Sequence, residues 1–369
     1  MADQVNVLIL GGCGFIGRHL VAYLIDNNLA QKICIADKSP PQTAWLNELH
    51  KKAFDDSRVE FRQANLVNPA HVDRAFAADG FAFDYVINLA AETRYGQGNE
   101  VYEEHVYKLS LNCARKAAQC KVKRYVELST AQVYSSDKKI CDETRKTSPW
   151  TALAKFKLQV EGELASIENL NYVVIRPSIV YGVGDKQGLT PRLIIGAVYK
   201  QLQEKMKLLW TKDLHMSTVH VEDTVKAIWF LCTNGKHGEV YNLADKQEST
   251  QGSISDVVCQ IFGIKYDFFG TVVSNMAKIN MNGVVDDSNE KHLSPWSEAC
   301  TADGIENTPL SPYLDKELLY NNHLYVDGSK IEKLGFQYTK PNVTVDELKL
   351  VVDDYVKLAV FPPSLAVQK

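Results

Sequence analysis

The sequence lacks the marks of several large protein classes. Its eight cysteines include no Cys-x-x-Cys pair, so neither a zinc site nor a disulfide framework is indicated. No apolar run approaches the roughly 20 residues needed to span a bilayer, and the first residues show no charged-then-apolar leader. A net charge of −4 gives no sign of binding to nucleic acid or to a membrane surface. We therefore expect a cytoplasmic protein with no metal site and with neither nucleic acid nor a membrane as a partner.

Strands and helices alternate along the first half of the chain. The 369 residues are 45% hydrophobic and 23% charged, which suits one large domain or two modest ones. Six short apolar runs predict strands separated by helical patterns, at residues 5–10, 33–36, 59–61, 85–89, 124–129 and 172–175. This alternation predicts an α/β fold with a parallel sheet covered on both faces.

The second half of the chain has a weaker pattern. Helices are predicted at 190–204, 223–233 and 253–262, and apolar residues at helical spacing return at 343–359. Residues 275–312 are polar and turn-rich and show no clear period. We expect this stretch to be a long loop or lid that borders a substrate cleft.

The most informative motif lies at the start of the chain. A strand at 5–10 is followed by Gly11, Gly14 and Gly17, then by a helix and a second strand that ends in Asp37. Gly11 permits a tight turn, Gly14 lets the backbone approach a pyrophosphate, and Gly17 lets the helix pack closely on the strand. The helix N-terminus offers free N–H groups to the phosphates. This context predicts a dinucleotide-binding unit.

The acid at the end of the second strand indicates which dinucleotide binds. Asp37 is placed to accept hydrogen bonds from a ribose diol, and its charge would repel a 2′-phosphate. Lys38 is adjacent and would soften that repulsion. We therefore predict NAD as the cofactor, with NADP less favoured.

Seven motifs, in this order, resemble those of the extended short-chain dehydrogenase/reductases, a family that includes nucleotide-sugar epimerases and dehydratases. They are GGCGFIG at 11–17, NLAA at 88–91, LSTAQVY at 128–134, RPSIVYG at 176–182, VHVED at 219–223, VYNLAD at 240–245 and K-x-x-x-LGF at 330–336. The resemblance implies a Rossmann-type doubly wound domain over 1–177 and a smaller α/β substrate-binding region over 178–369 interleaved with it. It also implies a small-molecule substrate and a homodimer formed through helices at about 101–118 and 150–166.

The resemblance also implies a set of cofactor-binding residues. These are Gly11, Gly14, Phe15, Ile16, Gly17, Asp37, Asn65, Leu66, Leu89, Ala90, Ala91, Lys157, Pro177 and Ile179. The same family uses a hydroxyl residue, a tyrosine and a lysine four residues after the tyrosine. Thr130 and Lys157 match the first and the last, but Leu153 stands at the tyrosine position. A leucine there has no ionisable proton and would make the floor of the pocket apolar.

Three substitutes for the missing tyrosine can be considered. Tyr134 and Lys138 form a literal Y-x-x-x-K, although they follow a strand and a spacing of four aligns side chains only on a helix. Thr151 and Lys155 are also four apart, but an aliphatic hydroxyl ionises far above the roughly pH 10 of phenol. Finally, residues 92–95, with Glu92, Arg94 and Tyr95, either reach the cofactor's edge or are ordinary surface-loop residues.

Two further departures from the family concern the substrate. The dehydratases carry Asp-Glu where this chain has Ala131-Gln132, and nucleotide-sugar enzymes place a diphosphate-binding arginine where it has Met216. We therefore predict an atypical oxidoreductase or epimerase acting on a small or apolar alcohol or carbonyl compound. The alternative is a catalytically silent NAD(P)-binding sensor, scaffold or regulatory subunit.

Overall fold

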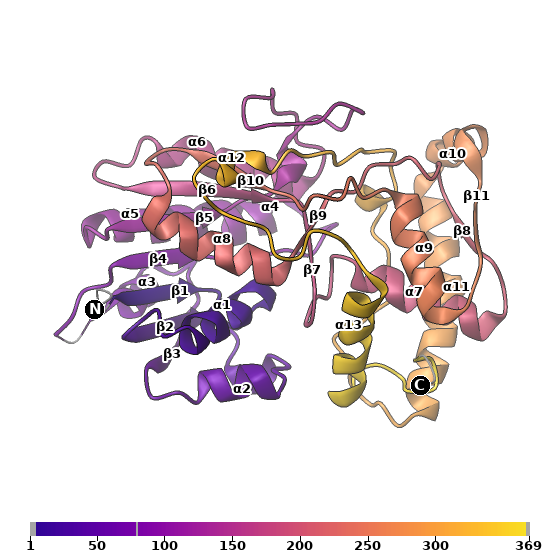
Figure 1. Ribbon diagram of the computed structural model, residues 1–369, viewed down its shortest axis with the longest axis horizontal. Helices are drawn as coiled ribbons and strands as arrows, with labels where there is room; N and C mark the ends of the chain where they lie inside the picture. Colours follow the sequence, from indigo (N-terminus) through magenta and orange to yellow (C-terminus); the bar gives the residue numbers. More distant parts are fainter. Residues whose placement is uncertain (1–4, 79, 367–369) are drawn as a thin grey trace.

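The computed structural model describes residues 5–78 and 80–366, and its centre is a sheet of seven parallel strands (Figure 1). The strand order is β10-β6-β5-β4-β1-β2-β3, and every neighbouring pair is parallel. The strands are β1 (Asn6–Leu10), β2 (Lys32–Asp37), β3 (Val59–Gln63), β4 (Tyr85–Asn88), β5 (Arg124–Leu128), β6 (Tyr172–Pro177) and β10 (Val240–Leu243). The predicted Rossmann-type doubly wound sheet is confirmed.

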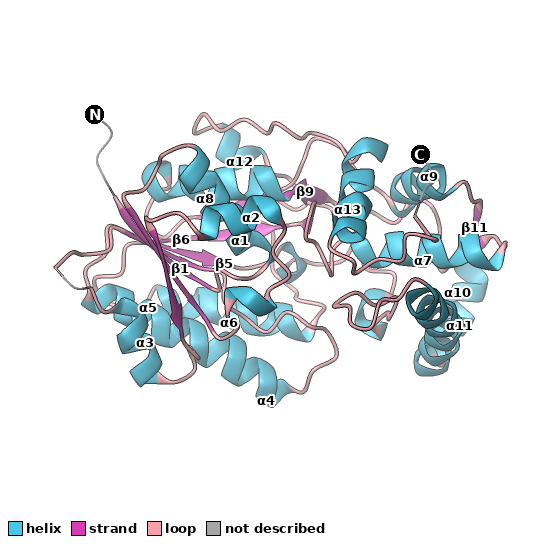
Figure 2. Cartoon of the chain, turned by 90° about the horizontal axis from the view of Figure 1, so that it is seen from below, coloured by secondary structure: helices cyan, strands magenta, loops and turns pink. Residues whose placement is uncertain are grey.

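Helices cover both faces of this sheet (Figure 2). Successive residues of a strand point to opposite faces, so Val7 and Ile9 of β1 enter one core cluster while Leu8 and Leu10 enter another. The first face carries α1 (Phe15–Asp26), α2 (Glu48–Phe54) and α8 (Val221–Asn234). The second carries α3 (Pro69–Phe76), α5 (Leu109–Gln119) and α6 (Ala152–Leu164). Burial on both faces explains why β1 and β4 are nearly continuous apolar runs, whereas the edge strand β3 reads VEFRQ and has no fully buried residue.

A second group of helices packs around its own core beside the carboxyl ends of the strands. It contains α7 (Thr190–Leu202), α9 (Gln251–Phe262), α11 (Met281–Ala302) and α13 (Val345–Lys357). Two small parallel pairs complete the strands: β7 (Ile179–Tyr181) pairs with β9 (Thr218–His220), and β8 (Met206–Leu208) pairs with β11 (Tyr266–Phe268) within the second group. Because α8 and β10 return to the central sheet, the chain after residue 177 contributes to both halves.

Short elements complete the fold. Before α5, the chain forms α4 (Asn99–Tyr102) and a π-helical turn (Glu103–Lys108), and α12 (Ser329–Glu332) precedes α13. Single 3₁₀ turns lie at Pro41–Thr43, Ala131–Val133 and Lys316–Leu318. In the described part of the chain, no helix is both long and apolar enough to cross a membrane.

The segment 275–312 corrects one prediction, because most of it is helical. It lies in α10 (Gly270–Ile279) and α11, and only Asn280 and 303–312 lack regular structure. The buried stripe of α11 recurs at helical spacing but includes the polar side chains of Asn289 and His292, and Pro295 lies inside the helix. Asn289 bonds both the N–H and the carbonyl of Leu314, which explains a polar residue in that stripe. These polar residues interrupt the helical spacing of apolar residues in the sequence. The helix forms nevertheless, because most of its stability comes from tertiary packing.

Candidate active site

One large cleft lies between the carboxyl ends of the central strands and the second group of helices. Its volume is about 1670 Å³. One end is lined by the glycine turn and Asp37, and the other end by residues of α7, β8 and α11. Thr130, at the end of β5, lines the cleft as well. A crevice outside the carboxyl ends of parallel strands is where open α/β sheets bind ligands.

The glycine turn has the conformation that its sequence predicts. Gly11 has a φ of +78°, and a Cβ at this position would lie 2.7 Å from the backbone nitrogen of Ala90. A Cβ on Gly17 would lie 2.5 Å from the Cα of Gly12. Gly14 begins α1 as its N-cap and offers no side chain to the helix's free N–H groups. Those N–H groups therefore remain available to an anion in the cleft.

Asp37 is held in place by this turn. Its Oδ2 accepts a hydrogen bond from the N–H of Cys13 at 3.0 Å, and its Oδ1 accepts one from the N–H of Ser39 at 3.0 Å. Burial raises the pKa of the carboxyl, and these two hydrogen bonds oppose the rise. The carboxylate is thus positioned at the edge of the cleft, as recognition of a ribose diol requires.

Most of the predicted cofactor residues line this one cleft. They are Gly11, Gly14, Phe15, Ile16, Gly17, Asp37, Asn65, Leu66, Leu89, Ala90, Ala91 and Ile179. Pro177 and Lys157 do not line it, although Ser178, next to Pro177, does. The fold thus brings together residues that are far apart in the sequence, and their contacts with a cofactor remain predictions.

Lys157 points into the protein interior. Its Nζ donates a hydrogen bond to the carbonyl of Leu128 at 2.6 Å and lies 3.3 Å from Oε1 of Glu127. Glu127 is fully buried and also accepts hydrogen bonds from Asn88 and Tyr125. In this arrangement Lys157 neutralises a buried carboxylate, and its predicted contact with the nicotinamide ribose stays a prediction.

Leu153 packs away from the cleft. It belongs to a small apolar cluster with Tyr102 and Val106 and does not line the cavity. The expectation that it forms an apolar pocket floor was therefore wrong. Tyr134 is not in the cleft either, because its buried hydroxyl donates to Asn242 and accepts from Arg176, each at 2.8 Å. Lys138 lies in a bend, so the literal Tyr134–Lys138 pair does not form on a helix.

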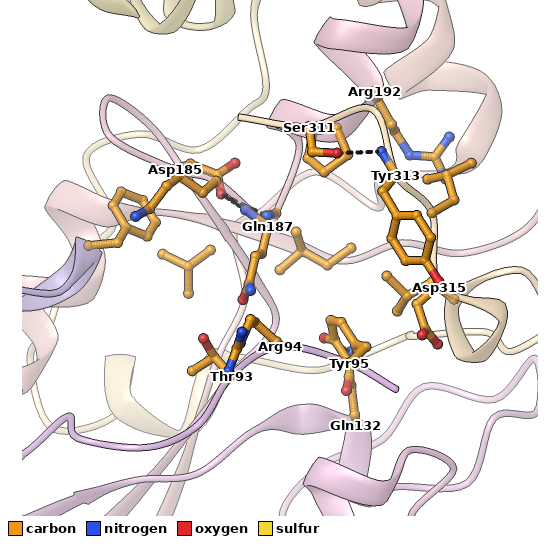
Figure 3. A pocket seen from close by; sticks show the side chains of 18 of the residues that line it. Thr93, Arg94, Tyr95, Gln132, Asp185, Gln187, Arg192, Ser311, Tyr313 and Asp315 are labelled. Carbon is orange, nitrogen blue, oxygen red and sulfur yellow. Dashed lines mark hydrogen bonds between the residues drawn. The ribbon is translucent and has the colours of Figure 1, made fainter. Parts of the chain in front are cut away.

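The loop after β4, in contrast, contributes directly to the cleft. Glu92, Arg94 and Tyr95 all line it, and Figure 3 shows Arg94 and Tyr95 with Gln132 at one side of the cavity. Glu92 and Arg94 form a two-point ion pair at 2.8 to 3.0 Å. The Tyr95 hydroxyl accepts a hydrogen bond from Nε2 of Gln132 at 2.9 Å. The sequence left open whether these residues reach the cofactor's edge or lie in an ordinary surface loop. Because they line the cleft, they belong to the candidate site.

An arginine that sequence reasoning missed lies at the opposite side. Arg192 of α7 lines the cleft near Ser311 and Tyr313 (Figure 3). Its Nη2 lies 3.2 Å from Sδ of Met216, and among residues 5–78 and 80–366 it forms no ion pair. Burial lowers the pKa of the guanidinium to about 10. The only signal in the sequence was a single charge within the apolar stretch LTPRLIIGAV.

The site shows no metal-binding cluster. Within the described ranges, no three His, Cys, Asp or Glu side chains are grouped so that they could hold a metal ion.

The fold and the cleft define a dinucleotide-binding α/β protein. Residues 7–244 match the model of the NAD dependent epimerase/dehydratase family, and the chain belongs to that family. This result confirms the predicted family and its NAD-dependent class of chemistry.

Similar proteins have low sequence identity but extensive coverage. A dTDP-glucose 4,6-dehydratase of Neisseria meningitidis is 24% identical over 89% of this chain and 99% of its own length. A trifunctional UDP-glucose 4,6-dehydratase, epimerase and reductase of Arabidopsis thaliana is 22% identical over 82% of this chain, which spans only 46% of that relative. The crystal structure of a Streptomyces venezuelae dTDP-glucose 4,6-dehydratase with NAD bound superimposes with a TM-score of 0.70, at 20% identity, over 96% and 97% of the two chains.

Proposed function

We propose that this protein is an NAD-dependent oxidoreductase or epimerase whose substrate is a nucleoside diphosphate sugar. The observation that carries the proposal is that one cleft has a dinucleotide turn at one end and, at the other, Arg192, which forms no ion pair with any described residue. Single-ligand pockets are typically about 300–1,000 Å³. The cleft, at about 1670 Å³, has room for a dinucleotide and a second ligand of nucleotide size.

Arg192 supports an anionic second ligand. A charge taken out of water without a partner is unfavourable, so an anion that binds beside it gains a strong interaction. A guanidinium offers a planar fork of donors that matches two phosphate oxygens. Arg192 also contacts Met216, the position where the family's nucleotide-sugar enzymes carry their arginine. Arg192 of α7 would thus bind the phosphates in place of an arginine at position 216.

This proposal replaces the small or apolar substrate that we predicted from the sequence. That prediction rested on Ala131-Gln132, on Met216 and on an apolar floor formed by Leu153, and Leu153 does not line the cleft. The relatives named above act on dTDP-glucose and UDP-glucose, which supports a sugar nucleotide here.

The residues near Thr130 favour hydride transfer over water elimination. NAD, when bound, accepts or returns a hydride. Thr130 lines the cleft, where its hydroxyl can bind a substrate oxygen, whereas Ala131 and Gln132 provide no acid and base for loss of water. We therefore propose oxidation, reduction or epimerisation at a carbinol carbon without dehydration.

Calorimetric titration with UDP and dTDP tests the proposal. Arg192→Ala should weaken binding of the nucleotide by about 10- to 150-fold, because hydrogen bonds to a charged group contribute about 1.5–3 kcal/mol. NAD affinity should not change. Lys200→Ala is a matched control on the same helix, since Lys200 bonds the carbonyls of Leu365 and Ala366 outside the cleft.

An exchange of positions makes the test sharper. Adding Met216→Arg to Arg192→Ala should restore nucleotide binding, because both side chains reach the same place. A wild-type protein that binds neither UDP nor dTDP would contradict the proposed substrate class.

The catalytically silent sensor or scaffold remains a second candidate. Its specific support is that Leu153 supplies no phenol and that Lys157 is engaged by Glu127. Hydride transfer to or from any sugar nucleotide would rule it out. The predicted homodimer and the cytoplasmic location remain predictions, which analytical ultracentrifugation and cell fractionation can check.

A further inference from the structure

A directed chain of hydrogen bonds leads from the start of α6 to the cleft. The N–H of Ala154 donates to Oγ1 of Thr151 at 3.1 Å, so the Thr151 hydroxyl is free to donate to Oε1 of Gln132 at 3.0 Å. With its oxygen occupied in this way, the Gln132 amide directs Nε2 to the hydroxyl of Tyr95 at 2.9 Å. Tyr95 therefore accepts, and its own phenolic proton remains for a ligand in the cleft.

The loop that carries Tyr95 is fixed on both sides. The Tyr102 hydroxyl donates to the carbonyl of Arg94 at 2.7 Å and accepts from the N–H of Gln97 at 3.4 Å. The Glu92–Arg94 ion pair closes the loop on its other side. A phenol held by a fixed loop and by Gln132 loses little conformational freedom when it binds a ligand, which is the property expected of a preorganised site.

Thr130 and Tyr95 both line the cleft, and Gln132 bonds the hydroxyl oxygen of each. The N–H of Gln132 donates to Oγ1 of Thr130 at 3.2 Å, and the side chain of the same residue holds Tyr95. Both hydroxyl oxygens accept from Gln132, so the proton of each remains for a ligand in the cleft. The other phenol considered from the sequence, Tyr134, is outside the cleft.

We infer that Tyr95 is the proton-transfer residue of this site and takes the place of the tyrosine that α6 lacks. Thr151 and Gln132 are positioning residues that set the direction of its hydroxyl. The inference rests on the proposed function, since it needs a carbonyl or alcohol substrate bound between Thr130 and the dinucleotide.

The step balances in the direction of reduction. The substrate carbonyl carbon accepts a hydride from NADH while its oxygen accepts the Tyr95 proton, which gives an alcohol, NAD⁺ and a phenolate that regains a proton from water. Burial raises the pKa of Tyr95 to about 12, with Glu317, Tyr102 and Asp315 adding to the rise and the Gln132 hydrogen bond opposing it. At neutral pH Tyr95 is therefore protonated, which suits donation to an alkoxide.

The test uses the full-length protein loaded with NADH and mixed with UDP-4-keto-6-deoxy-D-glucose. Tyr95→Phe should lower the single-turnover rate of NADH oxidation by about 10²–10⁴-fold, the usual contribution of a positioned acid or base. Its affinity for UDP and for NADH should equal that of wild type. Its affinity for the ketosugar nucleotide should fall by about 2- to 10-fold, the contribution of one neutral hydrogen bond. Tyr134→Phe is the matched control and should keep the wild-type rate.

The variant Gln132→Glu tests whether the direction of the hydrogen bond between residue 132 and Tyr95 matters, and not only the contact between the two side chains. A carboxylate can only accept from the Tyr95 hydroxyl, so the phenolic proton would turn away from the cleft. The rate should fall as far as in Tyr95→Phe, and the double variant should fall no further, because the two residues act as one unit.

Two results would overturn the inference. One is a Tyr95→Phe or Gln132→Glu variant that keeps the wild-type rate, and the other is a wild type that binds UDP and NADH but transfers no hydride to the ketosugar. Absence of UDP binding would instead show that the proposed substrate class has failed.

Discussion

Two glycines of the N-terminal turn, Gly11 and Gly14, should separate into a structural and a functional position when each is changed to alanine. Gly11→Ala places a Cβ 2.7 Å from the Ala90 nitrogen and 2.9 Å from the Leu89 carbonyl carbon, at a φ of +78°. The left-handed conformation costs an alanine about 1–2 kcal/mol, and displacement of the neighbouring backbone by the new Cβ adds about 1–3 kcal/mol. Gly11→Ala should therefore lower the free energy of unfolding by about 2–5 kcal/mol.

Gly14→Ala should behave differently. Gly14 has a φ of −68°, and a Cβ there meets only the Gly11 carbonyl oxygen, at 3.1 Å. Its main cost is a poorer N-cap, about 1 kcal/mol. Yet the new methyl group would stand where the pyrophosphate must approach α1, so NAD affinity should fall by at least about tenfold, or 1.4 kcal/mol.

Urea unfolding without cofactor and NAD titration measure the two effects separately. Gly304→Ala is the control for backbone strain alone, since Gly304 has a φ of +72° and no atom within 4 Å of its Cβ position. The reasoning is refuted if Gly14→Ala destabilises the fold as much as Gly11→Ala, or if it binds NAD as tightly as wild type.

Two further predictions concern buried charges. Lys157→Met leaves the fully buried Glu127 without its cation, which should lower the free energy of unfolding by about 3–5 kcal/mol, and adding Glu127→Gln should recover most of this loss in urea unfolding. Burial raises the pKa of Asp245 to about 7, above the roughly 3.9 of an unfolded aspartate. Between about pH 4 and pH 7 the native state therefore binds more protons than the unfolded state. The free energy of unfolding of wild type, compared with that of Asp245→Asn, should fall as the pH rises through this range. A stability difference that stays constant over this pH range would contradict the second prediction.

The sheet and the glycine turn could be predicted because their signals are local. Each buried strand is a short apolar run, and a glycine that needs a positive φ sits between a strand and a helix. The helix α11 was missed because its inward stripe includes Asn289 and His292, whose partners come from other segments. A short stretch of sequence shows the spacing of the stripe, but it does not show the distant residues that its polar members contact.

The candidate site was only partly predictable for a related reason. Asp37 ends β2 and Thr130 follows β5, so topology alone brings them to the cleft. Arg192 contacts Met216 across 24 residues, and no spacing rule connects them. Tyr95 lies in a loop whose position depends on Gln132 and Tyr102. The side chain of Lys157 could turn either to the cleft or to Glu127, and its position in the sequence does not decide between these directions.

The location of Arg192 changes what a bound phosphate would be attached to. An arginine at position 216 would tie the ligand to the segment that leads into β9, beside the central sheet. Arg192 ties it to α7, which packs against α9, α11 and α13. The phosphates would therefore be bound by the group of C-terminal helices, which face the dinucleotide turn across the cleft. In this protein, bound phosphates would therefore connect the C-terminal helices with the dinucleotide turn on the other side of the cleft.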